Sequence, residues 1–476
     1  MIIDGIGFRD SATMRSANHA IATFLDFIER RLGVTIVYEK NRLPFGRDDL
    51  HEPMRIAAQL VDLKVIKQCN RTPTIADEVP LKLWWSELEP GNRNNAGGGS
   101  VKDDAAAIYS TLAESLERYL WFTERDCFIR PRHATAAQIG NQPFLAPERF
   151  SAFSEAQRQR TPHIRFDAQT SFLWIQGVSL VTGQRTYVPA QTVSAAWRPG
   201  ETTPREPLVR TQVTTGLATW STQSGARLRG ALECIERDAY MIWWFNQLAP
   251  PLADTEKLRT RSASLNDLIA QCERYRFRVH IIPLLTDAPT HAVCAMVEDL
   301  SSIGPRFSFG LKAHRSLPQA AEGSIMEALR ARRFTRFGKA AEHYDPTKGV
   351  EAIGHRGRVH YWEIAENATY LERILANGTR EVPEAVWEND SEEEHLARIV
   401  KWCKEKGYEF VSVPFTRSRK NPTPWHIESV VIPELVPTHL SEDLRHLGGT
   451  RLKSVPESFG YIPREHPFIE RPHPFC

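Results

Sequence analysis

The sequence predicts a mixed α/β (α+β) protein in which long helices pack against β-sheets. Three long stretches repeat apolar side chains at helical spacing, and shorter stretches between them alternate apolar and polar residues or are rich in β-branched ones. With 476 residues and 41% hydrophobic content, the chain is long enough to bury a substantial core. We therefore expect one large domain or two of modest size.

The elements follow in order along the chain. Residues 1–54 stand slightly apart and predict a small N-terminal subdomain with a possible docking role, containing a helix over 20–31 and a strand over 34–38. The main body is expected over residues 55–420. Within it we expect residues 90–100 to interrupt regular secondary structure. The elements expected after them are a helix over 102–123, a hairpin over 172–188, a helix over 225–245, strands over 279–285 and 292–298, and a helix over 317–336.

The rest of the chain is more polar or richer in proline. Residues 340–400 predict a surface helix and loops, and residues 421–476 form a C-terminal segment with one β-like run at 429–433 and a proline-rich tail. The aromatic pair at Trp84 and the cluster at 243–245 are typical of core packing rather than of a ligand platform.

Composition excludes several classes of function. Sixty basic and 58 acidic residues leave a net charge of +2, so no strong field attracts nucleic acid or an anionic membrane. No apolar run reaches the length of a membrane span, and the N-terminus lacks the pattern of a signal peptide. The seven cysteines form no C-x-x-C pair, which argues against a disulfide framework or a structural zinc site. We expect a cytoplasmic protein that binds neither nucleic acid nor membrane.

Glutamates recur on the polar sides of the three long helices. Two near copies of Glu-x-x-Glu-Arg occur at 114–118 and 233–237, and the third helix carries Glu327. One such motif is typical of a solvated helix face, but two copies facing each other would place like charges together at a cost of about 1 kcal/mol per pair in water and more in a dry site. Cations or protons must then neutralise them. Carboxylate oxygens suit Mg²⁺, which often shares its ligands with nucleotide phosphates. The pattern predicts Mg²⁺ and ATP together.

Several segments make this pattern more specific, because they resemble the signatures of the YcaO family. The first is Thr214-Thr215-Gly216-Leu217-Ala218 followed by Ala226, Gly230 and Glu233-x-x-Glu236-Arg237-Asp238-Ala239. The others are Gly97-Gly98-Gly99-Ser100 with Ser110-x-x-x-Glu114-x-x-Glu117-Arg118, Phe309 to His314 with Glu327 and Arg332, and the hairpin end Tyr187-Val188-Pro189-Ala190. The resemblance covers most of the chain from about residue 55. Two residues depart from the family pattern: Thr215 replaces the usual asparagine, and Trp220 stands where a small residue is common.

The resemblance implies the YcaO fold and a nucleotide site without a P-loop, and indeed no G-x-x-x-x-G-K-[ST] motif occurs. It implies that Mg²⁺ is held by Glu114, Glu117, Glu233, Glu236 and Glu327. It further implies that ATP is contacted by Ser110, Glu114, Arg118, Glu233 and Arg332.

The activity implied is that of an azoline-forming cyclodehydratase, which uses ATP to activate a peptide amide. Members of this kind often end in a proline-rich tail that reaches the catalytic site, and here the chain ends Pro472-His473-Pro474-Phe475-Cys476. His473, Pro474 and Cys476 are therefore the catalytic candidates, and we expect His473 to change charge near neutral pH. The alternative for this segment is a disordered tail.

The resemblance also implies partners. We expect a ribosomal precursor peptide as substrate, a separate E1-like protein that binds its leader, a flavin-dependent azoline dehydrogenase, and a homodimer within a larger complex. Two alternatives stay open: a YcaO enzyme that makes peptide thioamides, and a scaffold that binds nucleotide without catalysis. The five intact glutamates argue against the scaffold, and the tail is the one feature that argues against thioamidation.

Overall fold

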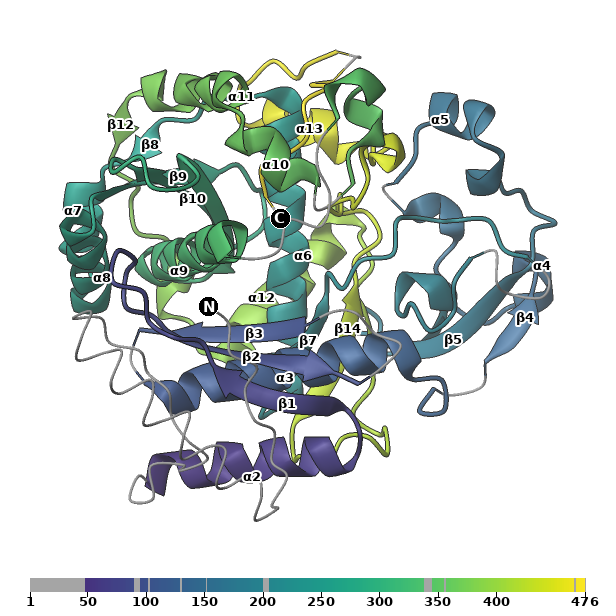
Figure 1. The fold of residues 1–476 in the computed structure, drawn as a ribbon. Coiled ribbons are helices and arrows are strands. Elements are labelled where there is room, and N and C mark those ends of the chain that lie inside the picture. Colours follow the sequence, from purple (N-terminus) through teal and green to yellow (C-terminus); the bar gives the residue numbers. More distant parts are fainter. Residues whose placement is uncertain are drawn as a thin grey trace. The chain divides into compact units, whose positions relative to one another are not determined.

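The structure is a computed structural model that describes residues 48–89, 95–101, 103–128, 131–150, 152–199, 205–337, 345–354, 357–465 and 468–475. These residues form two compact units. The first contains the described residues up to Glu124 together with Arg417–Trp425, and the second contains Arg125–Thr416 and the described residues from His426 onward. Both units combine helices with antiparallel sheets (Figure 1), so the predicted mixed α/β class is confirmed. The helix expected over 20–31 and the strand expected over 34–38 lie outside the described residues.

In the first unit, helix α3 packs on a three-stranded antiparallel sheet. The strands pair in the order β1 (Ile66–Arg71), β2 (Lys82–Leu88) and β3 (Asn95–Ser100). Helix α3 (Asp104–Thr123) buries the predicted stripe that includes Ile108 and Leu112, and its start is capped by Asp103, whose side chain accepts a hydrogen bond from the Ala106 amide. Helix α2 (Asp48–Asp62) contacts α3 and crosses the boundary that we expected at residue 54. A separate subdomain over 1–54 stays a prediction.

Strand β3 differs from expectation, because this Gly-rich stretch was expected to interrupt regular secondary structure. Glycine is unfavourable in strands, but here Gly98 pairs with Trp84 of β2 and lies directly beneath α3. A Cβ at Gly98 would lie 2.4 Å from the carbonyl oxygen of Ala107 and 2.5 Å from the amide of Thr111. The glycine is therefore what lets the helix approach the sheet so closely.

The second unit contains a six-stranded sheet. Its strands are β4 (Arg132–Ala134), β5 (Phe172–Ser179), β6 (Arg185–Pro189), β7 (Leu217–Trp220), β13 (Val411–Pro414) and β14 (His426–Val431). The order is β4-β5-β13-β14-β7, and β6 pairs with β5 in the register Ile175 opposite Val188. The predicted hairpin over 172–188 is therefore confirmed.

A three-stranded antiparallel sheet in the same unit carries α9. The strands β9 (Phe277–Leu284), β10 (His291–Asp299) and β11 (Phe307–His314) pair so that β11 is an edge strand. Helix α9 (Leu317–Phe337) packs on β11 and β10. As at β3, a glycine permits the contact: a Cβ at Gly310 would lie 2.1 Å from the Ser324 carbonyl oxygen of α9.

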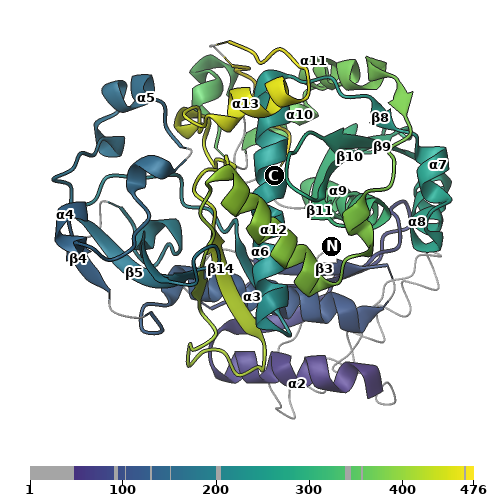
Figure 2. The ribbon, with the colours of Figure 1, turned by 180° about the vertical axis from the view of Figure 1, so that it is seen from behind.

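Helix α6 (Gln223–Asn246) is the longest helix described and is buried along most of its length. Figure 2 shows α12 (Glu392–Lys406) lying along it, where Leu228 and Ile235 pack against Ile399 and Trp402. At the other end of α6, the cluster 243–245 joins a core with β9, β10 and β11, which confirms it as core.

Shorter elements complete the second unit. They are β8 (Leu252–Ala253), which pairs in parallel with β12 (Thr379–Arg380), and the helices α4 (Ala136–Ile139), α5 (Glu155–Arg160), α7 (Thr255–Arg259), α8 (Ala263–Arg274), α10 (Gly357–Glu363), α11 (Ala365–Thr369) and α13 (Arg451–Ser458). The six cysteines that the structure describes are all free. Within the described ranges, no helix is long and apolar enough to cross a membrane.

Candidate active site

Glu233 and Glu236 lie one turn apart on α6, and the main chain holds one oxygen of each. Glu233 Oε2 accepts a hydrogen bond from the Gly216 amide at 3.3 Å, and Glu236 Oε2 accepts one from the Ala313 amide at 2.7 Å. Arg237 faces the other oxygens, with Nη2 at 3.7 Å from Glu233 Oε1 and 3.2 Å from Glu236 Oε1. The arginine therefore bridges the two carboxylates.

Glu327 of α9 adds a third carboxylate beside this pair. Its Oε2 accepts a hydrogen bond from the Leu311 amide at 2.6 Å. Leu311 and Ala313 are alternate residues of the edge strand β11, and alternate amides of a strand point to the same edge. The free edge of β11 therefore holds the carboxylates of Glu327 and Glu236 next to each other.

The charges of these groups are incompletely neutralised. Burial raises the pKa of Glu233 to about 7, a shift that the nearby Arg237 opposes and the negative charge of Glu236 reinforces. Burial also raises the pKa of Glu236, and the charge of Glu327 raises it further. Three carboxylates that offer only oxygen donors, held by the backbone and short of positive charge, fit a hard divalent cation such as Mg²⁺.

The first unit repeats this arrangement by itself. Glu114 Oε2 of α3 accepts a hydrogen bond from the Gly97 amide of β3 at 3.1 Å, and its Oε1 pairs with Arg118 Nη2 at 2.6 Å. Ser110 is exposed on the same helix and Glu117 is half-buried. In each Glu-x-x-Glu-Arg motif, one oxygen of the first glutamate is thus fixed by a glycine amide 17 residues earlier, at Gly97 and at Gly216. Whether the glutamates of α3 join those of α6 and α9 in one site stays a prediction.

Two cations of this site were missed as functional residues by sequence reasoning, although both lie inside the quoted motifs. Arg237 is part of the helix signature but was not among the residues expected to bind ATP or Mg²⁺. Lys312 is exposed on β11, and its charge lowers the pKa values of both Glu233 and Glu236. The signal that could have indicated Lys312 is that it is the one lysine of strand β11 and lies between the two residues whose amides bind the glutamates.

Residues 98–436 match the family model described as "YcaO cyclodehydratase, ATP- and Mg²⁺-binding". The match covers well over half of the chain and includes all five glutamates. The chain belongs to the YcaO family. No curated protein sequence matches the chain.

Solved structures show the same fold as this YcaO protein at low identity. One, titled a heterocyclase in complex with substrate and cofactor, aligns with a TM-score of 0.69 and 18% identity over 89% of this chain, which spans only 57% of that protein's length. The YcaO protein of Methanopyrus kandleri bound with AMPPCP and Mg²⁺ aligns with a TM-score of 0.57 and 17% identity, covering 81% of this chain and 91% of that one. A chain of the E. coli microcin synthetase McbBCD complex aligns with a TM-score of 0.52 and 14% identity, covering 77% and 88%.

Arg332, expected to contact nucleotide in a YcaO protein, is occupied elsewhere in this structure. It is 1% exposed, its Nη2 lies 2.8 Å from Asp299 Oδ2, and it donates hydrogen bonds to the carbonyl groups of Pro305 and Ile303 at 2.8 and 2.7 Å. Arg332 therefore fastens the loop that connects β10 to β11. A nucleotide contact by Arg332 stays a prediction.

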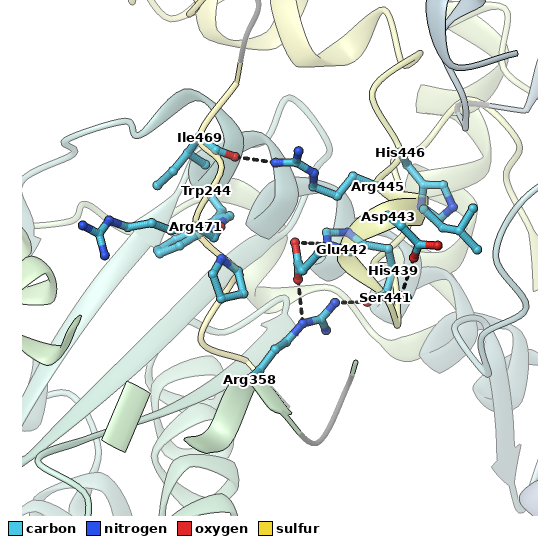
Figure 3. Close-up of polar contacts among 12 residues, drawn as sticks. Trp244, Arg358, His439, Ser441, Glu442, Asp443, Arg445, His446, Ile469 and Arg471 are labelled. Carbon is cyan, nitrogen blue, oxygen red and sulfur yellow. Dashed lines mark hydrogen bonds and ion pairs between the residues drawn. The ribbon is translucent and has the colours of Figure 1, made fainter. Parts of the chain in front are cut away.

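The C-terminal tail of this YcaO protein is ordered against α6 as far as Phe475. The indole of Trp244 donates to the Arg471 carbonyl at 3.2 Å, Trp362 donates to the Pro472 carbonyl at 3.2 Å, and the Phe475 amide donates to the Tyr240 hydroxyl at 3.2 Å. Figure 3 shows Arg445 beside the same segment, where it donates to the Ile469 carbonyl at 2.8 Å. The alternative of a disordered tail is therefore wrong for residues 468–475.

The end of the tail reaches the acidic site. The guanidinium of Arg237 lies 4.4 Å from the centre of the Phe475 ring, a cation–π contact, while the same group bridges Glu233 and Glu236. Pro474 is buried, and Cys476 lies outside the described residues. The tail thus contacts the arginine that organises the glutamates.

His473 requires a correction. We expected it to change charge near neutral pH, but it is 2% exposed and burial holds the pKa of its imidazole well below the usual value. Its ring packs edge-on against Tyr240 with 5.7 Å between ring centres. His473 is therefore neutral in the folded protein, and a proton-shuttle role near pH 7 is not supported.

Proposed function

We propose that this protein is an ATP-dependent cyclodehydratase that converts Cys, Ser or Thr residues of a ribosomal precursor peptide into thiazoline or (methyl)oxazoline rings. The observation that carries the proposal is the contact between Phe475 at the end of the tail and Arg237 within the group of three glutamates. Family membership supports the use of ATP and Mg²⁺. The ordered tail supports ring formation over the other activities of the family.

The residues proposed for Mg²⁺ are Glu114, Glu117, Glu233, Glu236 and Glu327, and those proposed for ATP are Ser110, Glu114, Arg118, Glu233 and Arg332. When bound, Mg²⁺ neutralises phosphate charge and favours phosphoryl transfer. The chain contributes the fixed positions of its carboxylates, because backbone amides hold one oxygen of Glu114, Glu233, Glu236 and Glu327. Arg332 reaches a nucleotide only if its pairing with Asp299 opens.

The proposed reaction has three steps. The side chain of Cys, Ser or Thr attacks the preceding carbonyl carbon, forms a C–S or C–O bond and loses its proton. The resulting oxyanion attacks the γ-phosphorus of ATP, and the bond to ADP breaks. Phosphate then leaves the carbon with its electron pair, the ring nitrogen loses a proton, and a C=N bond forms. Phosphate is a far better leaving group than oxide, so ATP removes the main obstacle to losing water from an amide.

Arg237 and the tail act on this reaction through position and charge. Arg237 is fixed on three sides, by Glu233, Glu236 and the ring of Phe475. A fixed cation beside the carboxylates proposed to hold Mg²⁺ stabilises negative charge that develops during phosphoryl transfer. His473 packs edge-on against Tyr240 and Pro474 is buried, so we assign both residues a positional role that directs Phe475 toward Arg237. A catalytic role for Cys476 stays a prediction.

The remaining partners are part of the proposal. The chain spans 57% of the length of the heterocyclase cited first. We propose that leader binding comes from a separate E1-like protein, that oxidation to azole comes from a flavin-dependent dehydrogenase, and that the enzyme forms a homodimer within a larger complex.

The test is mass spectrometry of a precursor peptide rich in Cys, Ser and Gly, incubated with the protein, the leader-binding partner and Mg²⁺·ATP. Each ring that a cyclodehydratase forms lowers the peptide mass by the mass of one water and releases one phosphate, which carries the amide oxygen away. An oxygen replaced by sulfur in the presence of sulfide would instead indicate thioamidation. Nucleotide binding without any change of peptide mass would indicate a scaffold, and either of the last two results would overturn the proposal.

A further inference from the structure

A second cluster of chemistry-bearing side chains lies where the tail meets the loop after β14. His439, Glu442 and His473 each offer one ligand atom, and these atoms all lie within 4.8 Å of one another. The three side chains are 1–2% exposed. His439 Nε2 is 3.1 Å from Glu442 Oε2, a separation that two ligands of one tetrahedral ion would have. None of the three belongs to the group of glutamates described above.

The histidines of this cluster lack the partners that buried imidazoles need. Among the described residues, neither ring nitrogen of His473 has a hydrogen-bond partner, and neither does Nδ1 of His439. The main chain of His439 is near enough to favour a charged His473, but not at a geometry that satisfies a ring nitrogen. A buried polar atom without a partner costs about 1–3 kcal/mol, so three such atoms in one place indicate a missing ligand.

The hydrogen bonding of the two imidazoles leaves ring nitrogens available to a metal ion. Among the described residues, neither ring nitrogen of His473 has a partner, and His439 directs Nε2 toward Glu442 while its Nδ1 has none. By contrast, His446 nearby has both ring nitrogens engaged: Nε2 accepts from the Thr211 amide at 3.1 Å, and Nδ1 lies 3.0 Å from the Pro437 carbonyl oxygen. The lone pairs of the cluster are thus available where those of its neighbour are not.

Arg358 holds the carboxylate in place (Figure 3). Its Nε donates to Glu442 Oε1 at 2.8 Å and its Nη2 donates to the His439 carbonyl at 2.9 Å, which leaves Glu442 Oε2 toward His439. A ligating carboxylate is commonly fixed by such an outer hydrogen bond. The charge of Arg358 opposes a cation, so the site must gain its affinity from the two imidazoles. This favours zinc-class ions over Mg²⁺ or Ca²⁺.

We propose that His439, Glu442 and His473 form a binding site for a divalent transition-metal ion of the zinc class, which ties the C-terminal tail to the loop after β14. His473 comes from the tail, whereas His439 and Glu442 come from the loop. The ion would therefore crosslink two segments that are far apart in sequence. This structural role is independent of the chemistry proposed for the glutamates.

The test is a titration of the full chain with Co²⁺ after removal of bound metals, in excess Mg²⁺ so that oxygen-only sites are filled. We expect one Co²⁺ per chain, with the intense visible absorption of a four- or five-coordinate site, displaced by Zn²⁺. His473→Gln should abolish this absorption. His395→Gln is the matched control, because His395 is also buried and has an Nδ1 without a partner among the described residues, but it does not belong to the cluster.

Thermal unfolding supplies the second measurement. Zn²⁺ should raise the melting temperature of the wild type and of the control, but not of His473→Gln, because only a native-state site is stabilised by its ligand. The proposal is overturned if the wild type binds no Co²⁺ or if His473→Gln keeps an unchanged spectrum. It is also overturned if Cys476→Ser abolishes binding, since the ion would then be held by a thiolate instead.

Discussion

Four glutamates of the candidate site, Glu114, Glu233, Glu236 and Glu327, are held in the same way: an amide of a neighbouring strand or turn binds one oxygen and leaves the second oxygen for a cation. Glu233 shows the consequence most clearly, since burial and Glu236 together outweigh Arg237 and raise its pKa to about 7. A carboxyl group that is half protonated near neutral pH binds a metal only by losing its proton. The affinity of the site for Mg²⁺ is therefore expected to depend on pH.

We predict that Mg²⁺ affinity falls as the pH decreases through 7. The folded, metal-free protein takes up a proton on Glu233 in this range, whereas a carboxyl group of ordinary pKa stays ionised. Between pH 8 and pH 6 the apparent affinity should fall by about tenfold for this one group. Isothermal titration calorimetry in buffers of different ionisation enthalpy measures both the affinity and the proton released. In Glu233→Gln the dependence should become shallower, and an affinity equal at both pH values in the wild type would contradict the prediction.

At the scale of elements, two strand–helix contacts depend on a glycine of the strand. Gly98 lies beneath α3 and Gly310 beneath α9, and each helix carries a glutamate that binds an amide of its own strand. Close packing therefore places the carboxylate within reach of the strand. This relation makes the glycines part of the site's construction although they touch no ligand.

Gly98→Ala should destabilise the protein, and Gly97→Ala should be nearly neutral. The two residues are neighbours in β3, but a Cβ at Gly98 would lie 2.4 Å from a carbonyl oxygen of α3, whereas a Cβ at Gly97 would meet its nearest neighbour, the Trp84 carbonyl, at 3.4 Å. We expect Gly98→Ala to lower the free energy of unfolding by about 1–3 kcal/mol, as overpacking does. Chemical denaturation measures the difference, and equal stabilities of the two variants would contradict it.

The tail is the second element that carries a prediction. Phe475→Leu keeps most of the side-chain volume but removes the aromatic face beneath Arg237, a contact of about 0.5–2 kcal/mol. We expect the rate of ring formation to fall severalfold while ATP affinity changes little. Phe459→Leu is the control, because Phe459 is 45% exposed. Deletion of residues 472–476 should reduce ring formation more severely and leave ATP binding nearly unchanged; a full rate in either variant would limit the tail to a packing role.

What the sequence could predict follows from how local each signal is. The three long helices were predicted within two residues because their apolar periodicity is local, and the hairpin was predicted by alternation. Strand β3 was missed because its sequence, rich in glycine, carries no strand propensity and is held by β2 and α3 instead. The neutral state of His473 depends on burial by residues such as Tyr240 and His439, more than thirty positions away, which no local pattern indicates.

At the scale of the whole molecule, we propose that the activity depends on separate partner proteins. The family model accounts for residues 98–436, and the chain spans 57% of the heterocyclase with the most extensive alignment reported above. Leader recognition is the function that we assign to a partner.

We therefore predict that the isolated chain binds a leader-plus-core peptide weakly and that high affinity appears only when the leader-binding partner is added. Calorimetry with leader peptide alone, core peptide alone and the joined peptide separates the contributions. The core peptide should gain little from the partner, which serves as the control. Tight binding of the leader to this chain alone would contradict the prediction and would direct attention to residues 1–54.

The central claim, that ATP activates the amide oxygen of a peptide, is tested most directly with a precursor peptide that carries ¹⁸O in the carbonyl group before the cyclised residue. If the oxyanion attacks the γ-phosphorus, the label leaves the peptide as part of inorganic phosphate, with one labelled phosphate for each ring formed. The Glu236→Gln variant should release almost no phosphate, because the substitution disrupts the carboxylate pair at Arg237. The account predicts ¹⁸O in the phosphate; rings formed with unlabelled phosphate, and the label found in water, would contradict it.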